Sequence, residues 1–254
     1  MILAIDAGNS RVKWGWHDGG AWAGLATVSL IEFAASNHDI NPFAATHENP
    51  ERIVISNVAG EGAHQLLVNW TSIFDAEPLW LRGEAERCGV RSRYDRPEQL
   101  GSDRWASLVA ARALHGGPCL VINAGTATTV DALSKDGEFL GGLILPGLDL
   151  MRFVLHEHTG RLPMQEGEYR DTPRNTIDAI ASGCQHAQAG AVERMHRVMG
   201  GGDLLCLVSG GAGRSLAQQL SIACRYVENL VLEGLARIAL SEQADAGAQP
   251  RRTG

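Results

Sequence analysis

The chain reads Ala4-Ile5-Asp6-Ala7-Gly8-Asn9 near its start and Val121-Ile122-Asn123-Ala124-Gly125-Thr126 near its middle. In both stretches, apolar residues typical of a buried strand end in a small glycine-containing turn, and a second apolar run follows. Gly8 and Gly125 lie 117 residues apart, and the Asp-Gly turns that follow the two stretches lie 118 residues apart. This nearly constant offset predicts an internal duplication. The alternative is a chance match, because glycine turns are common after strands.

The sequence Gly116-Gly117-Pro118 separates the two halves, since glycine and proline interrupt regular structure. We predict one α/β domain over residues 1–116, a second over residues 117–242 and a mobile polar tail over residues 243–254. Two similar domains that face each other are expected to enclose a ligand cleft. Hydrophobic periodicity predicts strands at 2–5, 12–16, 52–57, 78–81 and 204–208, and helices at 62–74, 103–114, 148–156, 175–199 and 227–240.

Length and composition are those of an ordinary globular protein. The 254 residues correspond to between one and two domains at about 150 residues per domain. Hydrophobic residues make up 44% and charged residues 20%, which excludes a disordered or fibrous chain. The net charge of −7 gives no general support to nucleic-acid binding, which needs a basic face. We therefore expect no nucleic-acid partner.

The cysteines and the apolar segments predict a cytoplasmic protein. The five cysteines are odd in number and scattered, without a C-x-x-C pair, as expected for buried thiols in a reducing compartment. The longest apolar stretch, residues 139–155, is interrupted by proline, aspartate and arginine, and no basic segment precedes the first strand. We expect neither a membrane span nor a signal peptide.

Three strands end in turns of small residues, at 6–10, 123–127 and 209–213. Glycine lets the backbone approach an anion closely and direct its N–H groups toward it, which is how phosphates are bound. None of the turns matches the P-loop or the G-x-G-x-x-G pattern. Each turn alone is ordinary, but three on paired halves predict a nucleotide bound between two domains.

Two charged residues near the first turn are candidates for phosphate chemistry. Asp6 ends a strand, so its carboxylate is placed either to meet Mg²⁺ through water or to cap the turn. Lys13 is one of only two lysines among 22 basic residues. It is either a compact positive charge near phosphate or a solvent-facing strand residue.

Asp103 lies in Gly101-Ser102-Asp103-Arg104, at the start of a predicted helix. In one reading it is the N-cap of that helix. In the other, it orients a hydroxyl nucleophile and accepts its proton during phosphoryl transfer.

Taken together, the motifs resemble those of the type III pantothenate kinases, a family of the acetate and sugar kinase, chaperone ATPase and actin superfamily. The resemblance extends over almost the whole chain, and five motifs occur in the family's order. They are residues 6–13 for D-x-G-N-[ST]-x-x-K, 94–105 for Y-x-x-P-x-x-L-G-x-D-R-W, 123–131 for the second phosphate loop, 141–147 for G-G-x-I-x-P-G and 176–183 for T-x-x-A-I-x-x-G.

The resemblance implies two actin-like (ribonuclease H-like) α/β domains with a nucleotide cleft between them. It implies an enzyme that uses ATP and Mg²⁺ to phosphorylate pantothenate to 4′-phosphopantothenate, the first step of coenzyme A synthesis. The expected state is a homodimer. Asp103 is the implied general base, and Arg104 is expected to face the pantothenate carboxylate. The implied ATP-binding residues are Asp6, Ala7, Gly8, Asn9, Ser10, Arg11, Val12, Lys13 and Thr126, and the pantothenate-binding residues are Tyr94, Gly101, Ser102, Asp103, Arg104 and Thr176.

Asn123 departs from the family pattern, which has Asp at this position, associated with a monovalent cation. The amide keeps an oxygen ligand but loses the negative charge. We therefore predict a weakened or absent requirement for K⁺ or NH₄⁺.

Two other functions are alternatives to the kinase interpretation. A nucleotide-binding transcriptional accessory factor without catalysis has no need of Asp6 and Asp103, yet both are present. A sugar or acyl kinase of the same superfamily accounts for the paired phosphate loops but not for residues 94–105.

Overall fold

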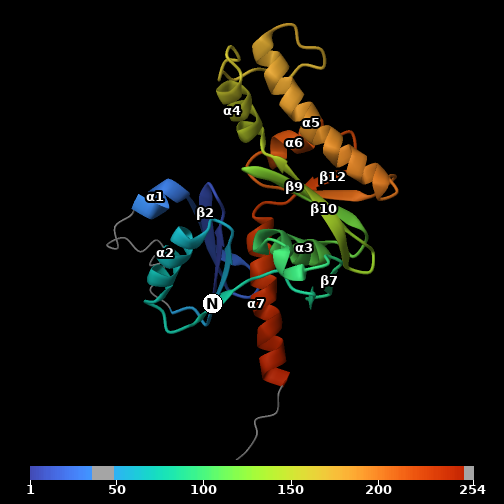
Figure 1. Ribbon diagram of the computed structural model, residues 1–254. Coiled ribbons are helices and arrows are strands. Elements are labelled where there is room, and N and C mark those ends of the chain that lie inside the picture. The colour runs from blue at the N-terminus through green and yellow to red at the C-terminus, as the bar shows by residue number, and fades with distance from the viewer. Residues whose placement is uncertain (36–48, 249–254) are drawn as a thin grey trace, which may run out of the picture. The chain divides into compact units, whose positions relative to one another are not determined.

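A computed structural model describes residues 1–35 and 49–248, which form two compact units (Figure 1). Unit 1 consists of Met1–Leu114 together with Leu230–Gly254, and unit 2 of His115–Asn229. The sequence-based division at residue 116 differs from this grouping in one respect. The last helix, α7 (Leu230–Ala248), packs with unit 1, although it follows unit 2 in the chain.

Unit 1 is built on a five-stranded sheet in the order β3-β2-β1-β4-β5. The first three strands of the chain pair antiparallel, whereas β4 and β5 continue the sheet in parallel with β1. Its elements are β1 (Ile2–Ala7), β2 (Arg11–His17), β3 (Trp22–Ser29), α1 (Leu30–Ala35), β4 (Arg52–Asn57), α2 (Glu61–Thr71), β5 (Pro78–Trp80), the hairpin β6 (Glu86–Arg87) and β7 (Val90–Ser92), a 3₁₀ turn (Pro97–Gln99), α3 (Ser102–Leu114) and α7.

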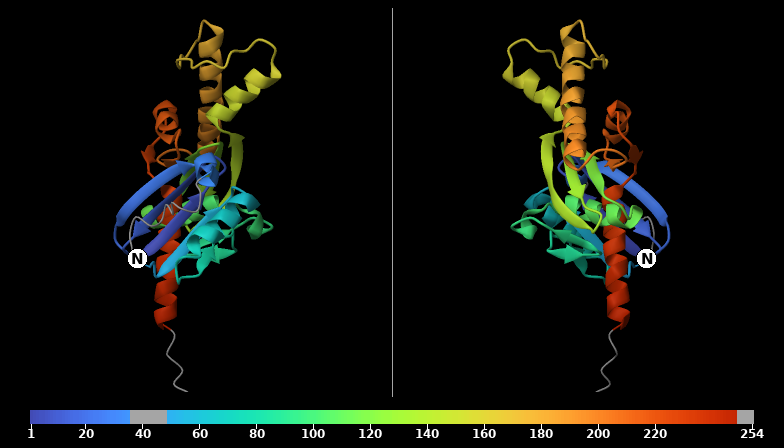
Figure 2. Two further views of the ribbon diagram at one scale, coloured as in Figure 1. Left: turned by 90° about the vertical axis from the view of Figure 1, so that its left-hand side faces the viewer. Right: turned by 90° about the vertical axis from the view of Figure 1, so that its right-hand side faces the viewer.

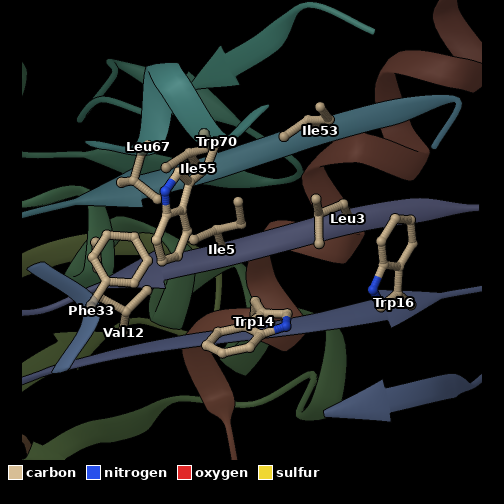
Figure 3. Close-up of a cluster of buried hydrophobic side chains, with 11 residues drawn as sticks. Leu3, Ile5, Val12, Trp14, Trp16, Phe33, Ile53, Ile55, Leu67 and Trp70 are labelled. Atoms are coloured by element: carbon tan, nitrogen blue, oxygen red, sulfur yellow. The ribbon is translucent and has the colours of Figure 1, made fainter. Parts of the chain in front are cut away.

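One face of the unit 1 sheet carries a hydrophobic core (Figure 3). Alternate residues of β1, β2 and β4 project to this face, as the period of a strand requires. Phe33 of α1 and Trp70 of α2 cover them, with ring centroids 4.2 Å apart. The strand residues of this core are Leu3, Ile5, Ala7, Val12, Trp14, Trp16, Ile53 and Ile55.

The other face of the same sheet is covered by α3 and α7, which lie side by side (Figure 1). The two helices approach closely because residue 234 is glycine, and a Cβ there would overlap the carbonyl oxygen of Ala106. Leucines and alanines of α7 are buried against α3, β1 and β4. This close packing explains why α7 belongs to unit 1.

Unit 2 has a sheet whose strands follow the order β12-β11-β8-β9-β10. Helices α5 and α6 pack on one face around a second hydrophobic core. Helices α4 and α5 extend past the sheet and are joined by residues 159–175 (Figures 1 and 2). The elements are β8 (Cys119–Ala124), β9 (Ala127–Leu133), β10 (Glu138–Pro146), α4 (Leu148–His158), α5 (Thr176–Val198), β11 (Leu205–Ser209), α6 (Gly213–Gln219) and β12 (Cys224–Tyr226).

The two stretches quoted first take the same position in their units. β1 pairs antiparallel with β2 and parallel with β4, and β8 pairs antiparallel with β9 and parallel with β11. Both β1 and β8 have six residues, and their burial follows the same order along the strand. The duplicated pattern in the sequence thus corresponds to a repeated strand arrangement.

The chain beyond residue 242 differs in part from the mobile tail that the sequence predicts. The backbone of residues 243–248 continues α7, and residues 249–254 lie outside the described residues. Within residues 1–35 and 49–248, no helix combines the length and the apolar character that a membrane span needs.

Candidate active site

Three polar side chains lie in a row across the unit 1 sheet, and we call them the first-unit row. They are Lys13 on β2, Asp6 on β1 and Ser56 on β4, which are neighbours in register. Register partners project to the same face of a sheet. This is the face covered by α3, because Ala7, the next residue of β1, points into the core on the opposite face. Ser56 is fully buried, whereas Asp6 and Lys13 keep some access to solvent.

Helix α3 brings Asp103 to this row. The helix begins at Ser102, whose Oγ lies 2.9 Å from the Oγ of Ser56, so its first turn is attached to β4. Asp103 is the second residue of α3, and its Oδ1 accepts the backbone N–H of Arg104 at 2.8 Å. That N–H is one of those that a helix start leaves without an intrahelical partner. Asp103 thus stabilises the helix start from inside the first turn rather than from the N-cap position.

Gly101 leaves room for the Asp103 carboxylate. A Cβ at residue 101 would lie only 2.7 Å from Oδ1 of Asp103 and 3.8 Å from Cγ1 of Val58. The carbonyl oxygen of Gly101 accepts the N–H of Trp105 at 3.0 Å, so its backbone is tied to the first turn of α3. A side chain here would displace the carboxylate, because the backbone has little freedom to move away.

The pKa of both acidic groups is raised. Burial, together with the negative charge of Asp103, raises the pKa of Asp6 to about 7, although the Lys13 ammonium acts in the opposite direction. Burial also raises the pKa of Asp103, while the N–H and the guanidinium of Arg104 lower it. Two carboxyl groups that interact in a poorly hydrated place favour uptake of a proton or a cation. Such perturbed acidic pairs are typical of functional sites.

Arg104 and Tyr94 form a second group beside Asp103. The Arg104 side chain is buried, and its Nη1 donates to the Tyr94 hydroxyl at 3.2 Å. The guanidinium carbon lies 5.8 Å from the centroid of the Tyr94 ring. A buried guanidinium has a planar set of donors that matches a carboxylate, so this group is suited to binding an organic acid.

The first glycine turn joins β1 to β2 beside the row. Gly8 donates its N–H to the Arg11 carbonyl oxygen at 2.9 Å, which closes the turn, and Asn9, Ser10 and Arg11 are exposed. The side chain of Val12 is fully buried in the hydrophobic core, as is that of Ala7 in the strand before the turn. These two residues therefore offer only their backbone to a ligand.

The remaining predicted site residues belong to unit 2. Asn123 is paired in register with Thr129 on β9 and with Ser209 on β11, and we call these three the second-unit row. Thr126 lies exposed in the second glycine turn, and its carbonyl oxygen accepts the Gly147 N–H at 2.8 Å.

Thr176 is also a unit 2 residue, at the exposed first position of α5. Asn175 caps that helix, since its Oδ1 accepts the Asp178 N–H at 2.8 Å. Asn175 is thus the N-cap of α5 and lies directly before Thr176.

Glycines bring the second and third turns of unit 2 together. Gly210 has a φ of +94°, and a Cβ there would overlap the backbone of Ala124. Ala212 donates its N–H to the Ala124 carbonyl oxygen at 3.0 Å. A Cβ at Gly147 would likewise overlap the backbone of Gly125 and Thr126. The glycines at 147 and 210 thus serve close backbone packing.

Sequence reasoning missed Ser56, which the structure places beside Asp6 and against the start of α3. Its signal was present, because a short apolar run ends there in Ser56-Asn57. A polar residue at the end of a buried parallel strand lies at the edge of the sheet where sites form. Taken alone, however, a serine before a loop is equally typical of a turn.

The sequence of the chain is similar to those of known kinases. The family model for type III pantothenate kinase matches residues 2–198. The chain belongs to the type III pantothenate kinase family. A type III pantothenate kinase from Aromatoleum aromaticum is 49% identical over 245 residues, which cover 96% of this chain and 100% of that protein. The reaction predicted from the sequence, ATP-dependent phosphorylation of pantothenate in coenzyme A synthesis, is therefore supported, and the two alternative functions are not favoured.

Solved structures show the fold. A protein from Sinorhizobium meliloti described as a 2-dehydro-3-deoxygalactonokinase aligns with a TM-score of 0.60 at 17% identity, covering 98% of this chain and all of that one. A protein from Campylobacter jejuni described as a Baf family transcriptional activator aligns with a TM-score of 0.62 at 22% identity, covering 95% and 99%. These identities are too low to carry function. The fold, two actin-like α/β domains, is confirmed.

Proposed function

We propose that phosphoryl transfer to pantothenate takes place at the Asp6 and Asp103 pair of unit 1. The observation that carries this proposal is the arrangement of the two carboxyl groups. Asp6 lies near the end of β1 in register with Ser56, and Asp103 follows Ser102, whose Oγ lies 2.9 Å from that of Ser56. The negative charge of Asp103 contributes to the raised pKa of Asp6. In the folded chain such a pair is unfavourable by itself. It becomes favourable when a positive charge or a proton donor enters, as happens when a kinase binds its substrates.

Asp103 is the proposed general base. It would accept the proton of the pantothenate hydroxyl while that oxygen attacks the γ-phosphoryl group of ATP. A pKa raised by burial suits this role, because a base is most effective when its pKa approaches the working pH. The bond from the Arg104 N–H to Oδ1 fixes the carboxylate in one orientation.

Asp6, Lys13 and the first glycine turn are the proposed phosphate-binding part of unit 1, with Thr126 of unit 2 as a further nucleotide contact. The Lys13 ammonium is a compact point charge, suited to phosphate oxygens. Residues 8–11 contribute backbone and exposed polar side chains to the same end of the strand pair.

Magnesium fits this acidic pair. Among the described residues, no three His, Cys, Asp or Glu side chains are grouped to hold a metal by themselves. Mg²⁺ in kinases is commonly bound by one or two carboxylates, with water and substrate phosphates as the other ligands. Asp6 would hold the ion, directly or through water, and the ion would supply neutralisation of phosphate charge.

The proposed pantothenate site lies around the start of α3. Arg104 would bind the substrate carboxylate with Tyr94 orienting its guanidinium, while Gly101 and Ser102 shape the site. Thr176 remains a proposed contact from unit 2. For Asn123, an amide in place of a carboxylate supports a weak or absent requirement for K⁺.

We further propose a cytoplasmic homodimer. In α4, none of the residues is buried, and Leu150, Phe153 and Val154 are 38%, 48% and 43% exposed. An apolar helix face of this kind is typical of a protein interface. None of the five cysteines, all of which lie among the described residues, forms a disulfide bond, as expected in a reducing compartment. Light scattering of wild type and of Phe153→Glu tests the dimer, because the charged variant should be monomeric.

The decisive experiment is an ATP-dependent assay that offers pantothenate beside glycerol, acetate and common sugars. We expect turnover of pantothenate, and a fall of about 10²–10⁴-fold in kcat for Asp103→Asn. Asp149→Asn is the matched control, since Asp149 is also the second residue of a helix but is exposed. Preference for another acceptor would overturn the substrate assignment, and an active Asp103→Asn enzyme would overturn the role of Asp103.

A further inference from the structure

Ser56 has an unusual position for a hydroxyl group. It is fully buried near the end of β4 and is the parallel register partner of Asp6 on β1. The preceding residues Ile53, Val54 and Ile55 are all buried and apolar. A buried hydroxyl is unfavourable unless it is hydrogen-bonded. Ser56 must therefore have its partner within the protein.

That partner is Ser102, the first residue of α3. The two Oγ atoms are 2.9 Å apart, and both side chains are buried. Ser102 immediately precedes Asp103 in the chain, and Ser56 lies beside Asp6 in the sheet. A single hydrogen bond thus connects the strand next to one carboxylate with the helix residue next to the other.

Two other hydrogen bonds at the helix start lie within α3 and therefore do not attach it to the sheet. The Arg104 N–H bond to Asp103 and the Ser107 Oγ bond to the Asp103 carbonyl oxygen, at 2.8 Å each, both lie within α3. Apolar packing of α3 and α7 holds the helix against the sheet but has no direction. A hydrogen bond is directional, so the Ser56 hydroxyl restrains where the first turn lies along β4.

We propose that Ser56 is a positioning residue for phosphoryl transfer, which holds the Ser102–Asp103 end of α3 in its productive place beside Asp6. This inference rests on the proposed role of Asp103. The proposed role of Ser56 involves no contact with either substrate. Ser56 acts through Ser102, and small displacements of a catalytic group lower the rate of the chemical step more than they lower binding.

The test measures steady-state kinetics of Ser56→Ala, Ser102→Ala and the double variant. We expect Ser56→Ala to lower kcat about 5- to 30-fold and to leave KM for ATP and pantothenate within about twofold. The kcat of the double variant should be close to that of the more impaired single variant, because both changes remove the same hydrogen bond. Ser56→Thr, which keeps a hydroxyl, should recover most of the lost kcat.

The matched control is Thr71→Val on α2, which also removes a buried hydroxyl, there bonded to the Leu67 carbonyl oxygen at 2.7 Å. We expect it to lower the melting temperature without lowering kcat. An unchanged kcat in Ser56→Ala, strictly additive effects in the double variant or an equal fall in Thr71→Val would each overturn the inference. If Asp103→Asn is impaired and Ser56→Ala is not, the proposed function stands and this inference alone fails.

Discussion

The first-unit row and the second-unit row occupy the same place in two similar sheets, yet only the first carries ionisable groups. Where unit 1 has Asp6 opposite Lys13, unit 2 has Asn123 opposite Thr129. Each row is completed by a buried serine on the neighbouring parallel strand. The backbone arrangement has thus been kept while the chemistry has diverged.

The two rows differ in charge, and the proposed reactive groups lie in the charged one. A carboxylate at the end of β1 interacts with Asp103, and its pKa is strongly raised. A neutral amide at the end of β8 brings no such unfavourable interaction. One row is therefore arranged for charge, whereas the other provides neutral polar groups and backbone. Exchanging residues between the rows tests this contrast directly.

The largest effect is expected when the carboxylate of the first-unit row is replaced by the amide that the second-unit row has at the same place. Asp6→Asn should lower kcat about 10²–10³-fold, because it removes the carboxylate proposed to hold the Mg²⁺ that neutralises phosphate charge. The measurement is kcat with saturating ATP, Mg²⁺ and pantothenate. Asp136→Asn, in an exposed turn of unit 2, is the matched control and should behave as wild type. An Asp6→Asn enzyme with near wild-type kcat would contradict the contrast.

The same variant makes a prediction about stability and pH. The pKa of Asp6 is about 7 in the folded chain, above the ordinary 3.8, so the folded state binds more protons than the unfolded state between these values. Stability should therefore fall as pH rises from about 4 to about 7. The fall in the free energy of unfolding over this pH range should be about 2–4 kcal/mol smaller in Asp6→Asn than in wild type, and screening by solvent reduces this difference. Urea unfolding at pH 5 and pH 8 without divalent cations measures the change in the free energy of unfolding. An equal change in wild type and in Asp6→Asn would contradict the prediction.

A smaller effect is expected from the other charged member of the row. Lys13→Thr places in unit 1 the residue that Thr129 provides in unit 2, and should lower kcat/KM for ATP about 10- to 100-fold. Lys135→Thr is the control, since Lys135 is the other lysine and is exposed in a turn. Equal losses in the two variants would show that Lys13 has no special place near phosphate.

Gly101→Ala changes the position of a carboxylate without changing any charge. The added methyl would press on Oδ1 of Asp103, the end of a movable side chain, so kcat should fall about 10-fold while the melting temperature changes little. Gly183→Ala is the control, because a Cβ there meets nothing within 4 Å. A large loss of stability in Gly101→Ala would instead point to backbone strain.

The smallest effect is expected in the second-unit row. Asn123→Asp restores a charge, and K⁺ should then raise activity by up to about fivefold, the range of a weak ion pair. Wild type should show only a weak requirement, or none, for K⁺ or NH₄⁺. The measurement is a titration of both ions at fixed ionic strength. A strict requirement in wild type would show that the amide is a sufficient ligand.

Much of the fold was predictable because its signals are local. The apolar runs that end in glycine turns predicted β1, β2 and β8, and the helix periods predicted α2, α3, α4 and α5 to within a few residues. The short strands β6, β7 and β12 were missed, and so were the longer β3 and β10. Most residues of β3 are exposed, so its sequence lacks the alternation of apolar and polar residues that marks a half-buried strand. The grouping of α7 with unit 1 was also missed, because the close approach at Gly234 depends on a helix more than a hundred residues earlier.

The candidate site was predictable in a different way. Local sequence left Asp6 and Asp103 with two readings each, and only the family resemblance favoured the chemical one. Their electrostatic coupling arises from the packing of α3 on the sheet, which periodicity does not specify. The sequence did not identify Ser56, because its hydrogen-bond partner, Ser102, is distant in sequence.

The return of α7 to unit 1 sets the order in which the ribosome completes the two units. All of unit 2 is synthesised before residue 230, whereas unit 1 lacks the helix that covers α3, β1 and β4 until residues 230–248 have emerged. Unit 1 is thus the first unit to begin synthesis and the last to be completed. Pulse proteolysis of nascent chains is expected to show unit 2 protected first, and a fragment cut at the duplication boundary leaves an uncovered sheet face open to chaperones.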